Sequence, residues 1–273
     1  MSKKTLAELL APSSGPARAA SEFTLVKPRI LVIDIETRPN LAYVWGLWDQ
    51  NIGLSQLVQA GNVISFAAKW YGEPETMFYS DFHHGHEAMV QAAWELMNEA
   101  EAIVHFNGVT FDMKHLNREF ILAGFTPPSP HKDIDLLRTV KSRFRFVSNK
   151  LQNVSTELGL AGKVQHSGFD LWLRCMAGDA EAWREMEEYN VQDVVLTEEL
   201  YDYLRPWIKN HPALGILVNA DELTCDQCGS HELSEQGTQT VGRLVYPRLL
   251  CGHCGAWRRG SKNIGRAGAT YGI

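Results

Sequence analysis

Apolar residues along this chain follow two alternating periods. Runs of strand length occupy residues 30–35 (with 24–26 as an alternative), 63–69, 76–79 and 102–106. Elsewhere apolar residues recur every three or four positions, which predicts helices over residues 85–100, 111–123, 135–145, 150–158 and 179–204. Three early strands, then a helix and a fourth strand, predict an α/β domain with a mixed sheet.

The first acidic motif, Asp34-Ile35-Glu36, directly follows an apolar run at residues 29–33. Because side chains alternate along a strand, Asp34 and Glu36 share one face. Two like charges at the end of a buried strand repel each other and lose hydration unless a cation lies between them. The alternative is a pair of ordinary acids on an exposed strand end, which is the commoner case for an isolated match.

The second motif runs from Asn107 to Asp112 and follows the apolar run at residues 102–106. The Asn107-Gly108 pair favours a turn with positive φ. We expect Thr110 to cap the next helix, which puts Asp112 in its first turn. An acid in that position can equally serve only to complement the helix dipole.

The third motif pairs Tyr189 with Asp193, which share one face of the predicted helix over residues 179–204. A buried tyrosine beside an exposed acid is the alternative for a single match. Acidic motifs at a strand end, a helix start and a helix face together favour a common cleft. Carboxylate oxygens suit Mg²⁺ or Mn²⁺, and four carboxylates suit a two-metal phosphodiesterase site. These patterns therefore indicate a nuclease.

In these motifs the chain resembles the DnaQ-like 3′-5′ exonucleases of the DEDD group, which have a ribonuclease H-like fold. That group carries Asp-x-Glu, then Asn-x(2–3)-Phe/Tyr-Asp, then either Tyr-x(3)-Asp or His-x(4)-Asp. Glu188 stands where the histidine branch has its histidine, so the resemblance is to the tyrosine branch, DEDDy. It covers residues 27–210 and is to the stand-alone bacterial and phage type that is similar to the family B polymerase proofreading domain.

The resemblance implies a ribonuclease H-like mixed sheet flanked by helices. It also implies hydrolysis at the 3′ end of single-stranded DNA, with release of nucleoside 5′-monophosphates, in replication, repair or recombination. Asp34 would bridge two Mg²⁺ or Mn²⁺ ions. Glu36 and Asp193 would help to hold the ion that activates water, and Asp112 would hold the other. Tyr189 would orient the attacking water.

Further residues are candidates for contact with the nucleic acid. Thr37, Asn107 and Phe111 match family positions that touch the terminal nucleotides. Phe111 suits stacking on a base and packing in the core equally well. Arg143 and Arg145 alternate with phenylalanines, a pattern that fits either a groove for single-stranded DNA or an ordinary helix surface.

Two Cys-x-x-Cys pairs near the end of the chain are separated by 22 residues. Cys225, Cys228, Cys251 and Cys254 predict one structural Zn²⁺, whose binding would supply folding energy to a region too small to be held by its core. Disulfides are the competing interpretation, and His231 and His253 are alternative ligands. Cys175 stands alone and is expected to fill apolar space.

Charge is unevenly distributed, although the net charge of the 273 residues is −6. After Glu235 there are six cations and no acid, so this part is formally +6 and the rest is −12. A basic end of this kind suits contact with the phosphate backbone or with a replication or repair protein.

The sequence predicts a flexible arm over residues 1–22, an exonuclease domain over 23–212 and a zinc ribbon with a basic tail over 220–273. No run of apolar residues is long enough for a membrane span or a signal peptide, which predicts a cytoplasmic protein without membrane partners. Residues 39–59 are expected to cover the cleft or to pack on the core. An exoribonuclease remains an alternative, because no residue indicates a sensor of the 2′-hydroxyl group. The other alternative is a non-catalytic nucleic-acid-binding module that recruits other proteins through its ribbon.

Overall fold

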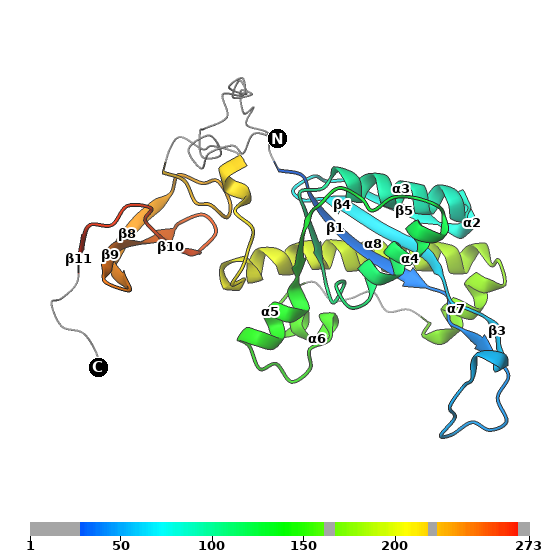
Figure 1. The fold of residues 1–273 in the computed structure, drawn as a ribbon. Helices are drawn as coiled ribbons and strands as arrows, with labels where there is room; N and C mark the ends of the chain where they lie inside the picture. Colours follow the sequence, from blue (N-terminus) through cyan, green and yellow to red (C-terminus); the bar gives the residue numbers. More distant parts are fainter. Residues whose placement is uncertain (1–27, 161–166, 218–222, 267–273) are drawn as a thin grey trace, which may run out of the picture.

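The computed structural model of this chain describes residues 28–160, 167–217 and 223–266. The predicted arm over residues 1–22 and the alternative strand at 24–26 lie outside the described residues. A sheet flanked by helices forms the main body, and a second, smaller sheet follows it (Figure 1).

The main sheet has five strands in the order β5-β4-β1-β6-β7. They are β1 (Ile30–Thr37), β4 (Val63–Trp70), β5 (Thr76–Ser80), β6 (Ala102–His105) and β7 (Lys132–Asp135). β1 and β5 both pair antiparallel with β4, whereas β1, β6 and β7 run parallel. The predicted mixed sheet of ribonuclease H type is confirmed.

Helices cover both faces of this sheet. They are α2 (Asp81–His84), α3 (His86–Glu99), α4 (Asp112–Leu122), α5 (Leu136–Arg143), α6 (Leu151–Glu157), α7 (Phe169–Met176) and α8 (Ala180–Leu204). The five helices predicted from the apolar period are present, with ends shifted by at most two residues. α3 and α4 pack on one face, and α5, α6 and α8 pack on the other.

Strand β1 is the centre of the fold because its side chains are buried on both faces. Leu31 and Ile33 pack with residues of α3 and α4, whereas Ile30 and Val32 pack with residues of α8. Burying one such side chain contributes about 1.5–3 kcal/mol. The same alternation sends the even-numbered Asp34 toward α8.

β7 and α7 of the main body were not predicted. The residues of β7 are Lys-Asp-Ile-Asp, so the strand has one apolar side chain and owes its conformation to pairing with β6. α7 is one short amphipathic helix of eight residues, too short for a clear helical period in the sequence.

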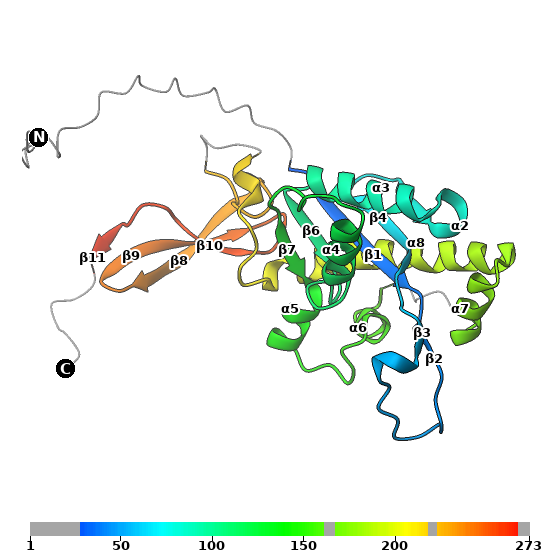
Figure 2. The same ribbon diagram turned by 45° about the vertical axis from the view of Figure 1, so that its right-hand side comes forward.

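Residues 40–61 form a hairpin, called the arm below. It contains β2 (Leu41–Ala42), η1 (Leu54–Gln56) and β3 (Leu57–Gln59), and β2 and β3 pair only with each other. The expectation that this segment packs on the core was wrong, because the arm projects beyond the end of β1 and its large apolar side chains are exposed (Figures 1 and 2).

The second sheet lies at the opposite end of the molecule from the arm (Figure 2). The chain reaches it through η2 (Arg205–Trp207) and η3 (Leu214–Leu217). Its strands are β8 (Leu233–Val241), β9 (Leu244–Cys251), β10 (Trp257–Arg259) and β11 (Gly265–Arg266), and the other three all pair with β9. No helix in the described ranges is long and apolar enough to cross a membrane.

Candidate active site

The carboxylates of the first motif lie at the carboxyl end of β1, on the face covered by α8. Asn190 of α8 is completely buried there, and its Nδ2 donates to Asp34 Oδ2 at 2.8 Å and to the Asp34 carbonyl at 3.3 Å. Ser65 of β4 in turn donates from Oγ to Asn190 Oδ1 at 3.2 Å. Asp34 is therefore held by an amide that is itself fixed on both sides.

Asp112 of the second motif contacts β1 from the side of β6, the strand that precedes it in the chain. The parallel ladder between β1 and β6 ends at Val32, which leaves the later amides of β1 available on that side. Asp112 Oδ1 accepts one of them, the Ile35 N–H, at 3.2 Å. Burial raises the pKa of Asp112 to about 6, against partial compensation from His105 and from backbone N–H donors. The second motif is thus bonded to the first.

A buried histidine shapes the turn before Asp112. His105 Nδ1 accepts from the Gly108 N–H at 3.0 Å, so its proton is on Nε2, which lies 3.3 Å from Asp133 Oδ1. A Cβ on Gly108 would lie 2.4 Å from the His105 ring, so this position needs glycine. Asn107 has the expected positive φ, 75°, and its N–H donates to Asp135 Oδ1 at 3.1 Å.

The helix cap expected at Thr110 was wrong. α4 begins at Asp112 with Phe111 in the capping position, and Phe111 makes no side-chain cap. The Thr110 hydroxyl is used one turn earlier, where it donates to Asn107 Oδ1 at 2.7 Å and contacts the Asn107 carbonyl at 3.1 Å. The prediction that Asp112 lies in the first turn is nevertheless confirmed.

Tyr189 and Asp193 lie one turn apart in α8, and both are buried. Burial, followed by the nearby charges of Glu36, Asp193 and Asp34, raises the pKa of the Tyr189 phenol. The phenol also shares a hydrogen bond with the Asp193 side chain. All three motifs, far apart in sequence, therefore meet at the carboxyl end of β1.

The donor set suits divalent cations that prefer oxygen. Asp34, Glu36, Asp112 and Asp193 offer only carboxylates, with no thiolate or imidazole among them. They are less tightly grouped than the cysteines described below, which alone in the described chain bring three or more ligand atoms within 4.8 Å of one another.

An open cleft of about 380 Å³ adjoins Glu36. Its lining comprises Glu36, Thr37, Pro39, Gly168, Phe169 and Trp172. Trp172 of α7 also meets the Tyr189 ring edge to face, with centroids 6.2 Å apart. Thr37, a predicted substrate contact, thus lines this cleft. Phe169 and Trp172 also line it, and the sequence analysis did not identify them as candidate contacts because α7 was not predicted.

The remaining predicted contacts lie at different distances from this cleft. Phe111 is 40% exposed and its ring lies 4.5 Å from the ring of His115, so it is not a core residue. Arg143 Nε donates to the carbonyl of Trp207 at 3.1 Å, beyond the end of α8. Eleven helical residues separate Asp193 from the end of α8 at Leu204, or about 16 Å. Arg143 and the exposed Arg145 remain predictions for a more distant part of a strand.

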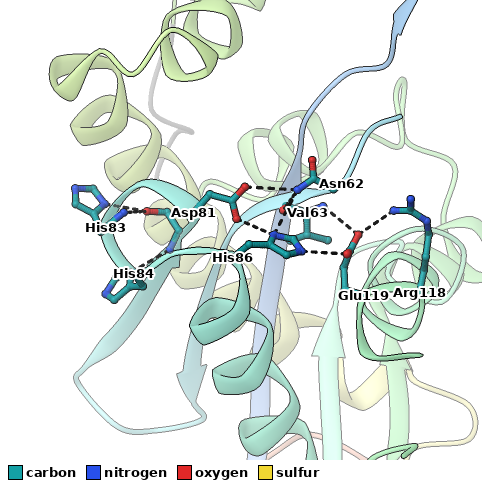
Figure 3. A network of polar contacts seen from close by, with 9 residues as sticks. Asn62, Val63, Asp81, His83, His84, His86, Arg118 and Glu119 are labelled. Atoms are coloured by element: carbon teal, nitrogen blue, oxygen red, sulfur yellow. Dashed lines mark hydrogen bonds and ion pairs between the residues drawn. The ribbon is translucent and has the colours of Figure 1, made fainter. Parts of the chain in front are cut away.

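A polar network holds α4 against the sheet (Figure 3). Glu119 of α4 is buried, and its two oxygens contact the Val63 N–H at 3.5 Å and His86 Nε2 at 3.2 Å. His86 Nδ1 lies 2.9 Å from Asp81 Oδ1, so the imidazole is placed between two carboxylates. The network ties the starts of α3 and β4 to the helix whose first turn carries Asp112.

Carboxylates gathered at the carboxyl end of the first strand of such a sheet are the arrangement that a metal-dependent nuclease site of ribonuclease H type needs. The chain belongs to the RNase H superfamily, whose family model matches residues 31–205. Members of this superfamily are generally nucleases that use divalent metals. A search of curated proteins found no match.

The cysteines form a second, separate site. Cys225 and Cys254 have their Sγ atoms 3.7 Å apart, as do Cys228 and Cys251. A disulfide needs about 2.05 Å, whereas sulfurs bound tetrahedrally at 2.3 Å from one Zn²⁺ lie about 3.8 Å apart. All cysteines in the described ranges are free thiols, so the disulfide alternative was wrong.

The pKa values of the thiols at this site shift in opposite directions, because burial raises that of Cys228 and the hydrogen bond with Cys225 raises that of Cys254, whereas that of Cys225 is lowered. The Cys254 thiol, followed by the backbone N–H groups of Cys228 and Gln227, lowers the pKa of Cys225 to about 4 despite its burial. The ligand group comprises the four cysteines, without His231 or His253. Cys175 lies elsewhere, buried among apolar residues that include Trp183, and burial raises its pKa to about 12, which confirms a filling role.

The turn formed by residues 225–228 contacts the main body. Gln227 is buried, and its Nε2 donates to the carbonyl of Arg205 at 2.9 Å, while the Gly215 N–H donates to the carbonyl of Asp226 at 2.8 Å. The Arg205 guanidinium lies over the rings of Tyr71 and Tyr201, at 4.8 and 4.5 Å from their centroids. The thiol site is thus joined to the carboxyl end of α8.

Proposed function

We propose that the protein is a 3′-5′ exonuclease of the DEDDy type that hydrolyses single-stranded DNA to nucleoside 5′-monophosphates by a two-metal mechanism. The observation that carries this proposal is the meeting of the three motifs around β1, shown by the bond from Ile35 to Asp112 and by the neighbours of Tyr189. Ordinary surface acids and a packing tyrosine have no reason to converge in this way.

The four carboxylates would hold two Mg²⁺ or Mn²⁺ ions: Asp34 both, Glu36 and Asp193 one, and Asp112 the other. When bound, such ions lower the pKa of a water molecule, neutralise charge on the phosphate and align the entering and leaving oxygens. The hydrogen bond from Asn190 Nδ2 to Asp34 Oδ2 restricts rotation of the Asp34 carboxylate.

Tyr189 orients water and does not act as a base in this proposal. Its raised pKa keeps the phenol protonated at neutral pH, so the group cannot remove a proton from water. The phenol donates its one proton to the Asp193 carboxylate, which fixes its direction, and its oxygen would orient the attacking water by accepting a hydrogen bond from it.

The cleft beside Glu36 suits the terminal nucleotide. Thr37 supplies a hydroxyl, and Phe169 and Trp172 supply aromatic surface on which a base of any identity can stack. An unpaired strand fits this arrangement better than a duplex, because stacking on protein requires a base that has left its helix.

The proposal is tested with 5′-labelled single-stranded DNA and RNA of the same sequence, in Mg²⁺ and in Mn²⁺, with a circular single strand as the control for end dependence. We expect a ladder that shortens from the 3′ end of the DNA and no cleavage of the circle. Cleavage of the circle would indicate an endonuclease, and faster loss of RNA would assign an exoribonuclease. Binding without any hydrolysis would favour the recruitment module.

For the second site we propose one structural Zn²⁺ and a ribbon that contacts the phosphate backbone or a replication partner. Four thiolates leave no open position for water, which suits structure and not catalysis. Arg258 is already paired with Asp226 at 2.5 Å, and Arg248 and Arg259 lie over aromatic rings, so Lys262 and Arg266 are the better candidates for phosphate contacts. Metal analysis of the purified chain tests the zinc.

A further inference from the structure

The arm carries the two most exposed tryptophans in the described part of the chain. Trp45 is 97% exposed and Trp48 is 84% exposed, and Leu47 and Leu54 are exposed to a similar degree. Indole rings are normally covered, because each buries a large apolar area when it has a partner. The arm is therefore a surface built for an occupant.

Contacts at its base hold the arm in place. The Tyr43 N–H donates to the carbonyl of Gln56 at 3.0 Å, and Gln56 Nε2 donates back to the carbonyl of Tyr43 at 3.0 Å. The Gly61 N–H donates to Asn40 Oδ1 at 2.7 Å, and Arg118 Nη1 donates to the carbonyl of Gly61 at 3.1 Å. These bonds anchor the base of the arm, and the bond from Arg118 joins it to the helix that begins with Asp112.

The arm is continuous with the cleft. β1 ends at Thr37, and Pro39, which lines the cleft, is the last residue before the arm. A strand whose 3′ end reaches the carboxylates through this cleft would lie beside Pro39, and Figure 1 shows the arm projecting from that end of the sheet.

The charge of the arm also points to bases as its occupant. Asp49 is the only charged residue between Asn40 and Gly61, so this surface has no cations to bind phosphates. Stacking on a base needs none, because every base presents an apolar π face.

We propose that the arm binds the single-stranded nucleic acid leaving the cleft, with Trp45 and Trp48 stacked on unpaired bases. This inference rests on the proposed nuclease function and adds a second binding region to it. The occupant is a strand long enough to span from the carboxylates to the arm, so short substrates do not use the arm.

The test compares full-length wild type with Trp45→Ala/Trp48→Ala, with Trp45→Phe/Trp48→Phe, and with Leu47→Ala/Leu54→Ala as the matched apolar control. Binding of fluorescein-labelled oligothymidylates of about 5 and about 20 nucleotides is followed by anisotropy without added Mg²⁺ or Mn²⁺. We expect the alanine pair to weaken binding of the long strand about 10- to 100-fold and to leave binding and turnover of the short strand nearly unchanged. The phenylalanine pair should recover most of the affinity, and the leucine pair should behave as wild type.

Equal weakening by the leucine pair would overturn the proposal, since it would indicate a general apolar contact. So would a wild-type dimer, measured by light scattering, that the tryptophan variants dissociate, because the occupant would then be a second copy of the chain. If wild type degrades both lengths and the alanine pair matches it on the long strand, the arm proposal fails while the nuclease function stands. A wild type without hydrolysis removes the nuclease function itself.

Discussion

Replacing Asp112 with asparagine should make the metal-free protein more stable while it abolishes hydrolysis. Asp112 is 4% exposed, and burial raises its pKa from 3.8 to about 6. The folded state therefore keeps a proton that the unfolded chain has already released, so the free energy of unfolding falls as pH rises from about 4 through about 6. Asparagine keeps the acceptor for the Ile35 N–H and carries no charge to desolvate.

The magnitude follows from the shift of about two pKa units. At 1.36 kcal/mol per unit, Asp112→Asn should add about 3 kcal/mol at pH 7.5 and almost nothing at pH 4. For a domain of this size that corresponds to a rise of about 6–12 °C in Tm. Mg²⁺ or Mn²⁺ should then stabilise wild type more than the variant, because the ions need the ionised carboxylate.

Thermal unfolding is measured from pH 4 to pH 8 without added Mg²⁺ or Mn²⁺ and without chelator, so that the thiol site is left intact. Asp170→Asn is the matched control, because Asp170 is also a first-turn acid but is exposed. Asp170→Asn should lower the free energy of unfolding by a few tenths of a kcal/mol near neutral pH, because it removes a negative charge that interacts with the helix dipole. An Asp112→Asn gain that is absent at pH 7.5, or equal at pH 4 and pH 7.5, would refute the argument from burial of charge.

Four further predictions address neighbouring groups. Tyr189→Phe should lower turnover about 10- to 1,000-fold with little change in the metal requirement, and wild-type turnover would make Tyr189 a packing residue. Asn190→Ala removes the donor to Asp34 and should raise the Mn²⁺ concentration for half-maximal activity about 10- to 100-fold, a titration that an inert core residue would not shift. Gly108→Ala places a Cβ 2.4 Å from the His105 ring and should lower Tm by several degrees, whereas Gly265→Ala, where a Cβ meets nothing within 4 Å, should not. Cys228→Ser should eliminate bound zinc and lower the stability of the ribbon, and a variant that keeps one zinc per chain would contradict the four-cysteine site.

Strand alternation was enough to predict that Asp34 and Glu36 share a face, and the four-residue spacing was enough for Tyr189 and Asp193. Both predictions depend only on the fixed side-chain period of a strand or a helix, so they need no knowledge of tertiary contacts. The same holds for the cysteine pairs, because a Cys-x-x-Cys turn places two thiols side by side on its own.

What could not be predicted depends on partners distant in sequence. Asn190 looks like any polar residue in an amphipathic helix until Asp34 and Ser65 are placed against it. β7 has almost no apolar content, and the arm has so much that it resembles core sequence. Thr110 obeys the usual preference for a cap, but a nearer acceptor at Asn107 competes for its hydroxyl.

The bond between Asn190 and Asp34 spans 156 positions in the chain, which has a consequence during synthesis. A ribosome adding about 5–20 residues per second completes β1 well before α8 exists. Until α8 has been made and has packed on the sheet, Asp34 and Glu36 lie on an uncovered strand face without Tyr189 or Asp193 beside them. A nascent or prematurely terminated chain therefore lacks a complete carboxylate cluster, and the proposed hydrolysis could begin only after the whole main body has folded.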